Sequence, residues 1–147
     1  MKEDTLNRLD EMFAATPMMR ADEVPSEAEV DAASNELGVA FSDDFREFML
    51  KYGGATVGPY PVFGLRPSEL IDDRWSVVEV TREIRAAGIE GVDSWVIVSE
   101  DHSGNPIGVD ESGKAWIFDH DFGGISELAP SFDEYVRVQC LNLSVSE

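Results

Sequence analysis

The segment ELGVAFSDDFREFMLKYGG, residues 36–54, contains the clearest structural pattern in the chain. Its large apolar side chains recur at the i, i+3, i+4 and i+7 spacing of a buried helix face, namely Phe45, Phe48, Met49 and Tyr52. Ser42 is a candidate N-cap, the two acids that follow it suit the positive end of the helix dipole, and two glycines end the pattern. The segment therefore predicts a helix over residues 42–52 that packs against a core.

Four further helices are expected from their apolar spacing and their end signals. The first carries one apolar stripe near the N-terminus, formed by Leu6, Leu9 and Phe13. The other three begin at capping boxes, in which a serine is followed three residues later by a glutamate: Ser26 with Glu29, Ser76 with Glu79, and Ser131 with Glu134. The sequence leaves open whether the N-terminal stripe docks on its own domain or on a second copy.

Strand patterns occupy the rest of the chain. A proline-rich stretch over residues 58–65 suits an edge strand, and three more strands are expected over residues 95–99, 106–110 and 114–119. The turns between these last three are short, so neighbouring strands run antiparallel. The chain is therefore predicted to form a single α+β domain over residues 1–147, with a mostly antiparallel sheet and helices packed on one face.

The charge of the chain is strongly one-sided, with 11 Lys and Arg against 30 Asp and Glu and a net charge of −19. Phosphate binding requires clustered cations, so direct binding to nucleic acid is not expected, and an anionic membrane would repel the chain. The sequence shows no secretory signal, and its single cysteine, Cys140, suits a reducing compartment, so we expect a cytoplasmic protein. The acidity has two interpretations: solubility alone, or a surface that imitates a polyanion for a cationic partner.

Catalytic patterns are weak throughout the chain. Two segments place histidine among carboxylates, Glu100-Asp101-His102 and Asp119-His120-Asp121, which would suit a metal-dependent enzyme. Neither has the ligand spacing of a recognised metal motif, and both fall where strands end, so solvated turns are the favoured interpretation. No serine stands beside a base and an orienting group. We therefore expect no enzyme activity, no catalytic residue, no bound metal and no cofactor.

Three motifs, taken in chain order, resemble the SUKH superfamily, which includes bacterial immunity proteins and yeast regulators of cell-wall assembly. The first is the segment 30–54, a helix that ends in Glu36-Leu37-Gly38 and an aromatic helix that ends at Gly53-Gly54, in which Ser42 stands where the family commonly has proline. The second is the strand pair of residues 107–110 and 115–121, which ends in an aromatic, Asp-His segment. The third is the helix start over residues 128–135, Leu128-Ala129-Pro130-Ser131-Phe132-Asp133-Glu134-Tyr135. The resemblance covers about residues 24–140, and residues 1–21 form an additional helix and linker outside it.

The resemblance implies a non-catalytic protein that binds and neutralises a cognate toxin encoded by a neighbouring gene. Combined with the net charge of −19, it favours a nuclease as the toxin. The expected contact patch consists of acids on strand ends and turns, with two helix-start acids second: Glu100, Asp101, Asp110, Glu111, Asp119, Asp121, Asp43 and Asp44. A scaffold or regulatory module in cell-wall assembly is the alternative. The sequence does not determine the toxin or the oligomeric state.

Overall fold

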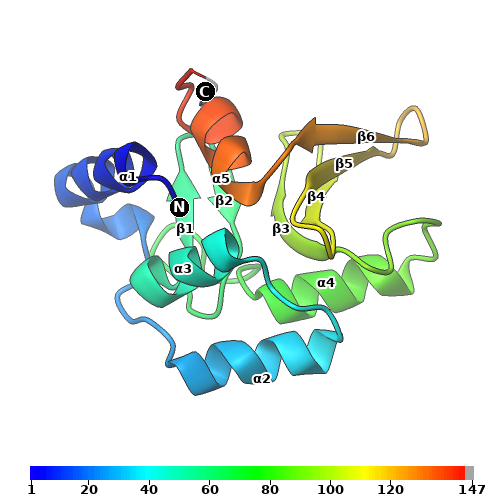
Figure 1. The fold of residues 1–147 in the computed structure, drawn as a ribbon, viewed down its shortest axis with the longest axis horizontal. Helices are drawn as coiled ribbons and strands as arrows, with labels where there is room; N and C mark the ends of the chain where they lie inside the picture. The colour runs from blue at the N-terminus through cyan, green and yellow to red at the C-terminus, as the bar shows by residue number, and fades with distance from the viewer. Residues whose placement is uncertain (145–147) are drawn as a thin grey trace.

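The computed structural model describes residues 1–144, which form five α-helices, two short helical turns and six strands (Figure 1). Their order is α1 (Glu3–Ala15), η1 (Pro17–Met19), α2 (Glu27–Leu37), α3 (Asp43–Tyr52), β1 (Ala55–Val57), β2 (Tyr60–Val62), α4 (Val77–Ala86), β3 (Val96–Glu100), β4 (Pro106–Val109), β5 (Ala115–Asp119), β6 (Gly124–Ala129), α5 (Phe132–Tyr135) and η2 (Val136–Cys140). The last of these is a π-helical turn that continues α5.

The six strands form one sheet in chain order, β1 to β6, and every neighbouring pair is antiparallel. This arrangement confirms the α+β class and the antiparallel meander. Two details differ from the expectation. The proline-rich stretch supplies only the second strand of a hairpin, because β1 precedes it and turns back through Gly58-Pro59. Strand β6 was not predicted, because its exposed residues lack the apolar alternation of a half-buried strand. Its strand conformation is defined by antiparallel pairing with β5.

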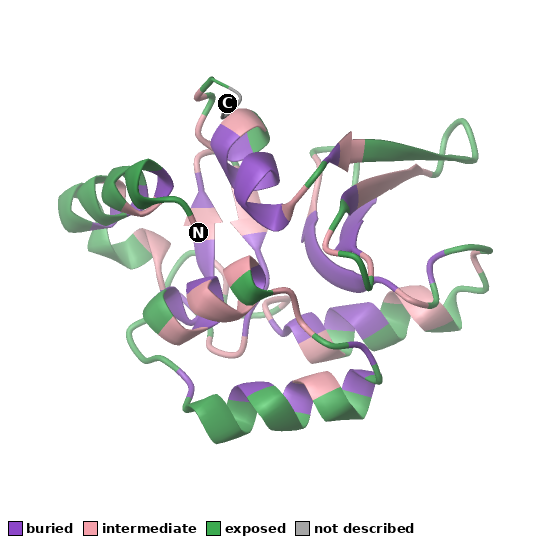
Figure 2. Ribbon diagram, in the orientation of Figure 1, coloured by how far each residue is buried: buried purple, intermediate pink, exposed green. Residues whose placement is uncertain are grey.

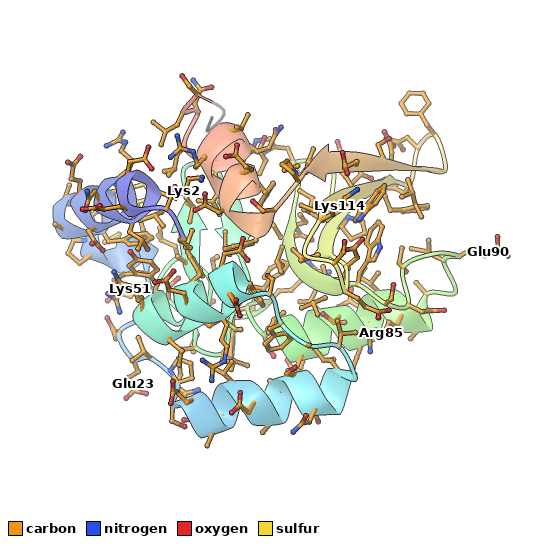
Figure 3. The ribbon with its side chains drawn as sticks, in the orientation of Figure 1. Lys2, Glu23, Lys51, Arg85, Glu90 and Lys114 are labelled. Atoms are coloured by element: carbon orange, nitrogen blue, oxygen red, sulfur yellow. The ribbon has the colours of Figure 1, made fainter. Side chains whose placement is uncertain are left out.

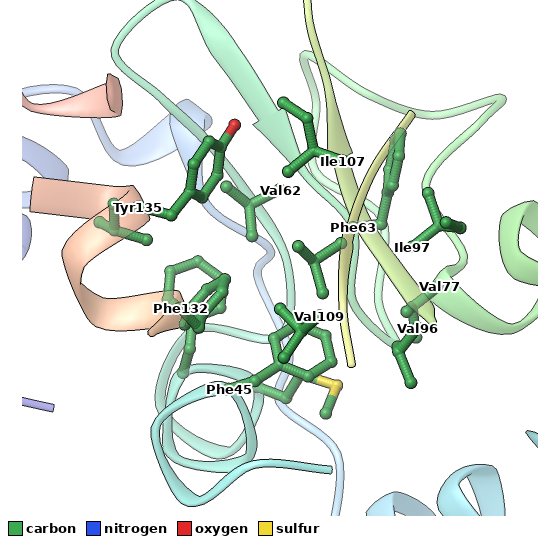
Figure 4. Close-up of a cluster of buried hydrophobic side chains, with 14 of the residues drawn as sticks. Phe45, Val62, Phe63, Val77, Val96, Ile97, Ile107, Val109, Phe132 and Tyr135 are labelled. Atoms are coloured by element: carbon green, nitrogen blue, oxygen red, sulfur yellow. The ribbon is translucent and has the colours of Figure 1, made fainter. Parts of the chain in front are cut away.

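The aromatic part of the core lies between the sheet and the helices α3 and α5, and α1, α2 and α4 add further buried apolar residues to it (Figures 2 and 4). Phe132 of α5 packs edge-on against Phe45 and Phe48 of α3, with ring centroids 5.1 and 5.5 Å apart. Tyr135 is fully buried, and its hydroxyl donates to Ser99 Oγ on β3 at 2.7 Å. The 36–54 segment thus supplies the aromatic half of the core, as its apolar spacing predicted.

Helix α1 packs on its own domain, which the sequence had left open. Leu9 is fully buried, and Phe13 packs edge-on against Tyr52 with ring centroids 5.0 Å apart. The buried guanidinium of Arg137 donates to Thr5 Oγ1 at 3.1 Å and pairs with Asp4 Oδ2 at 2.7 Å. These contacts join the first helix to the C-terminal one.

The predicted serine N-caps form at three of the four helix starts, and the full capping box forms at one of them. Ser26 and Glu29 form the full reciprocal capping box, while Ser76 and Ser131 each accept the N–H of the glutamate three residues on. The prediction for Ser42 was wrong in its chemistry: Ser42 stands at the N-cap of α3, but its hydroxyl makes no capping hydrogen bond. Asp44 caps instead, because its Oδ1 accepts the N–H of Phe45 at 2.9 Å.

Helix α4 does more than cover the sheet. It lies along the half of β3 that β2 does not pair with, since β2 and β3 share a single register pair, Val62 with Ser99. There Thr81 Oγ1 accepts the N–H of Ile97 at 2.9 Å, and Arg85 donates to the carbonyl of Trp95 at 3.2 Å. The helix therefore satisfies backbone groups that a neighbouring strand would otherwise have to pair.

Candidate functional site

The eight predicted contact acids fall at three places in the fold. Successive turns of an antiparallel meander lie at alternate ends of the sheet. The β3–β4 turn (residues 101–105) and the β5–β6 turn (residues 120–123) therefore share one end, and the β4–β5 turn (residues 110–114) lies at the other. We call the first the acidic end; it carries Glu100, Asp101, Asp119 and Asp121.

Asp101 organises the first turn of the acidic end. Its Oδ1 accepts the backbone N–H groups of Ser103 at 2.9 Å and Asn105 at 2.8 Å, and its Oδ2 accepts the Asn105 amide at 2.9 Å. Partial burial by itself would raise the pKa of Asp101, but these hydrogen bonds together outweigh it and lower the pKa below its ordinary value. The carboxylate is therefore ionised at neutral pH and engaged in holding the turn.

Asn105 joins the two turns of the acidic end. It is buried, and its Oδ1 accepts the backbone N–H of His120 at 2.9 Å. In the second turn Asp119 Oδ1 accepts the N–H groups of Asp121 at 3.0 Å and Phe122 at 3.3 Å. These bonds fix the turns relative to each other and present Asp121 and Phe122 outward.

The remaining groups of the acidic end are paired less tightly. His102 packs its ring on Tyr60, with centroids 5.1 Å apart, and His120 Nε2 lies 3.5 Å from Asp121 Oδ1. Glu100 forms an ion pair with Arg74. Among residues 1–144, no group of three or more His, Cys, Asp or Glu side chains is arranged to hold a metal ion.

Asp110 performs a turn-holding task at the opposite end of the sheet. Its carboxylate accepts from the Ser112 N–H at 2.9 Å, the Ser112 hydroxyl at 2.7 Å, the Lys114 N–H at 3.1 Å and the Trp116 indole at 2.8 Å. Burial opposes ionisation here too, but the four bonds prevail and lower the pKa of Asp110. Glu111 beside it is exposed.

The third place is the start of α3, which lies next to the Asp110 turn. A Cβ added to Gly113 would lie 3.8 Å from the Cβ of Ser42. Asp44 has both oxygens occupied by backbone N–H groups, the second being that of Asp133 at 2.9 Å, whereas Asp43 is exposed. Of the eight acids, Glu111, Asp121 and Asp43 are thus the ones whose carboxylates are most free to meet a partner.

The exposed apolar residues near the acidic end were not singled out from the sequence. Phe122 is 89% exposed at the tip of the β5–β6 turn, and Ile125 on β6 is 40% exposed. A phenylalanine between Asp121 and the two glycines 123 and 124 is itself the available signal, because a short polar turn offers no core for the ring.

Cations are distributed unevenly over the surface. Three arginines pair with acids of α2 and the segment before it: Arg46 with Glu27 and Asp31, Arg66 with Glu23 and Glu29, and Arg82 with Glu36. In residues 95–144 the basic residues are Lys114 and Arg137; Arg137 is buried, and Lys114 pairs with Glu127 at 3.2 Å. The strand half of the molecule therefore presents acids with little cationic compensation from its own residues. Lys114, its exposed cation, is labelled in Figure 3.

Other features of the described residues bear on chemistry. Cys140 is buried, which raises the pKa of its thiol to about 12 and keeps it protonated at neutral pH. An open groove between α2 and α4 has a floor that includes Ala33, Leu65 and Val78. No helix within residues 1–144 has the length and apolarity needed to cross a bilayer.

Comparison with known protein families identifies a relationship. A family model described as the SMI1 / KNR4 family (SUKH-1) matches residues 25–138. A search of curated proteins found no match. The matched region begins just before the Ser26 cap of α2 and ends within η2, so α1 lies outside it although it packs on the core.

Proposed function

The chain belongs to the SMI1 / KNR4 family (SUKH-1), and from this premise we propose that it is an immunity protein, which binds and neutralises a cognate bacterial toxin by direct contact. In this proposal the protein is not an enzyme and acts in the cytoplasm. A toxin that is delivered by a competing cell, or made by the cell that carries the immunity gene, would reach its target there. The toxin would be a polymorphic toxin encoded by a neighbouring gene, with a nuclease as the favoured class.

The observation that carries the proposal is the imbalance of charge in the strand half of the molecule. A nuclease must present a cationic surface to nucleic acid, and covering that surface blocks the enzyme without chemistry. The acidic end and its neighbours offer the opposite field on a fold whose turns are fixed by internal hydrogen bonds. A rigid acidic surface is a suitable inhibitor of such an enzyme because little entropy is lost when it docks.

The division of roles among the acids follows from their contacts. Asp101, Asp110 and Asp119 hold turns, so their contribution to a partner is mainly the electric field that they add. Asp121, Glu111 and Asp43 are exposed and can form direct ion pairs, although Asp121 Oδ1 already lies 3.5 Å from His120 Nε2. A field of this kind speeds encounter, while a few buried apolar contacts set the dissociation rate.

The test is co-expression of the protein with the C-terminal toxin domain encoded beside its gene. Immunity predicts that growth is rescued and that the two purified proteins elute together on size exclusion. A catalytically inactive toxin serves as the binding partner in the second measurement. Failure of rescue together with separate elution would overturn the proposal.

The alternative, a regulatory module in cell-wall assembly, makes a different prediction. It requires a gene neighbourhood of wall-synthesis or regulatory genes without a toxin, and deletion would alter wall assembly in cells that meet no competitor. Immunity predicts that the same deletion has an effect only when the toxin is present.

A further inference from the structure

The sheet has three stretches of strand edge that no neighbouring strand pairs with, and they differ in whether other parts of the chain cover them. An open edge presents unpaired N–H and C=O groups, which proteins commonly cover to prevent unwanted strand pairing. The three stretches are β1 at one side of the sheet, the half of β3 that β2 leaves free, and β6 at the other side.

Two of the three edges are closed by the chain itself. At β1, Arg20 forms a β-bridge with Ala55, and the carbonyl of Gly54 accepts the N–H of Ala21 at 2.9 Å. At β3, Thr81 and Arg85 of α4 take the place of a strand, as described above.

Strand β6 is left open. It is six residues long, and within the described part of the chain it pairs only with β5. Residues 124–127 are exposed, and Figures 1 and 2 show the strand at the rim of the sheet with no helix beside its first residues. The other two edges show that this chain covers such edges, so an uncovered one is a candidate docking surface.

Apolar side chains lie next to the open edge. Ile125 is paired across the strands with Phe118, and both lie on the face of β5 and β6 that also carries half-buried Trp116. Phe122 projects from the turn that leads into β6 and is 89% exposed. An exposed aromatic ring beside a free strand edge provides what strand addition requires: backbone hydrogen bonds for affinity and a side-chain anchor for specificity.

The acidic residues around the edge of β6 favour a cationic binding partner. Asp119 and Asp121 lie at the start of the turn, while Glu127, on β6 itself, is already paired with Lys114 at 3.2 Å. A second copy of this chain would bring the same acids, on a molecule of net charge −19, against them, so pairing of two β6 edges is disfavoured. An extended segment bearing Lys or Arg is attracted to the same place.

We propose that the edge of β6 receives an extended, Lys- or Arg-bearing segment of the toxin as a seventh strand, with Phe122 inserted between side chains of that partner. This inference rests on the proposed function and states which surface carries it out. The acidic end then steers the toxin to the edge, and the backbone of β6 holds it.

The first experiment measures the affinity of the Phe122→Ala variant for the catalytically inactive toxin domain encoded beside the gene. The expected result is a Kd weakened by about 30-fold, the loss typical of a central interface anchor. Leu70→Ala is the matched control, because Leu70 is 52% exposed in the loop between β2 and α4 and lies on neither β6 nor its turns; its Kd should not change. Equal affinities for the wild type and Phe122→Ala would overturn the role of the anchor.

The second experiment tests the strand edge with prolines at two adjacent positions, Ile125→Pro and Ser126→Pro. Along an edge strand successive N–H groups alternate between the neighbouring strand and solvent. The proline that removes the inward N–H lowers the Tm, and the one that removes the outward N–H leaves the Tm near that of the wild type but prevents binding. Amide hydrogen exchange of residues 124–129 should slow in the complex, while that of β1 should not.

The outcomes separate the two proposals. A wild-type complex whose affinity is unchanged by the outward-position proline overturns strand addition at β6 and leaves immunity standing. A wild type that forms no complex and gives no rescue overturns immunity, and this inference with it.

Discussion

At the residue scale, acids that resemble a contact patch in the sequence perform two different tasks. Asp110 accepts four hydrogen bonds and holds the β4–β5 turn, whereas Glu111, its neighbour, is exposed and accepts none of them. The difference arises because a carboxylate at the first position of a tight turn reaches the N–H groups two and four residues on, and the next residue points away. Turn geometry therefore decides which acids are free.

This assignment predicts a pH-dependent defect in Asp110→Asn. At pH 7 the amide replaces one acceptor oxygen by a donor that faces another donor, so the free energy of unfolding should fall by about 1 to 2 kcal/mol. Because folding lowers the pKa of Asp110, its stabilisation is complete above its unfolded pKa of about 3.9 and is lost as the pH falls through the folded value.

The measurement is urea denaturation of the wild type and the variant between pH 7 and pH 3. The gap between their unfolding free energies should narrow below about pH 4. Glu111→Gln is the matched control, since it changes the adjacent, exposed carboxylate and should leave stability unchanged at every pH. A gap that stays constant down to pH 3 would contradict the assignment.

At the element scale, α1 is the helix whose place was hardest to predict. Its apolar stripe of Leu6, Leu9 and Phe13 indicates that one face of the helix is buried, but the stripe does not identify the surface that covers this face. The structure gives that surface as the domain's own α3 and C-terminal helix, through Tyr52 and Arg137. The helix is therefore part of the core although it precedes the matched family region.

This packing predicts that truncation of the stripe destabilises the whole domain. Leu9→Ala should lower the free energy of unfolding by about 3 kcal/mol, because it removes a fully buried side chain and leaves a cavity. Leu6→Ala, at a half-buried position of the same helix, should cost about 1 kcal/mol or less. Both are measured by urea denaturation.

The same measurement distinguishes this arrangement from one in which α1 docks on a second copy of the chain. If α1 docked on a second copy, the effect of Leu9→Ala on stability would vary with protein concentration. We expect the midpoint of unfolding to be independent of concentration for both variants.

Strand β6, unlike α1, could not be recognised as an element from its sequence. Its residues Gly124 to Glu127 are exposed, so they carry no burial pattern from which a strand can be recognised. Hydrogen bonding to β5 defines the strand, and β5 itself was predicted from its apolar residues. The serine caps of α2, α4 and α5 were recognisable because each joins residues only three positions apart.

At the scale of the whole molecule, the net charge of −19 predicts how the protein meets its proposed partner. Exposed charges interact over about 8 Å at physiological salt and over only about 3 Å at 1 M. Raising NaCl from about 50 mM to about 500 mM should therefore slow association with the toxin by about tenfold, with a smaller effect on dissociation.

Stopped-flow or surface-based kinetics measure both rates. Asp121→Asn should reduce the salt dependence of association, because Asp121 is exposed at the acidic end, whereas Asp22→Asn, an exposed acid before α2, should reduce it less. An association rate that does not respond to salt would contradict steering by the acidic end.

The sequence by itself determined the features that depend on neighbours along the chain. These are the helices, because their apolar spacing and caps repeat within one or two turns; the meander, because its connections are too short for another path; and the acidic character of the surface. The three family motifs likewise lie within continuous segments.

Only the tertiary structure decided the features that join distant residues. It divided the eight acids between two ends of a sheet and the start of α3, docked α1 on its own core, closed β1 and β3 with other parts of the chain, and left β6 open beside Phe122. The physical reason is that burial and hydrogen-bond satisfaction are properties of neighbours in space. A carboxylate, an apolar stripe or a strand edge is therefore recognised locally, but what it contacts is set by the fold.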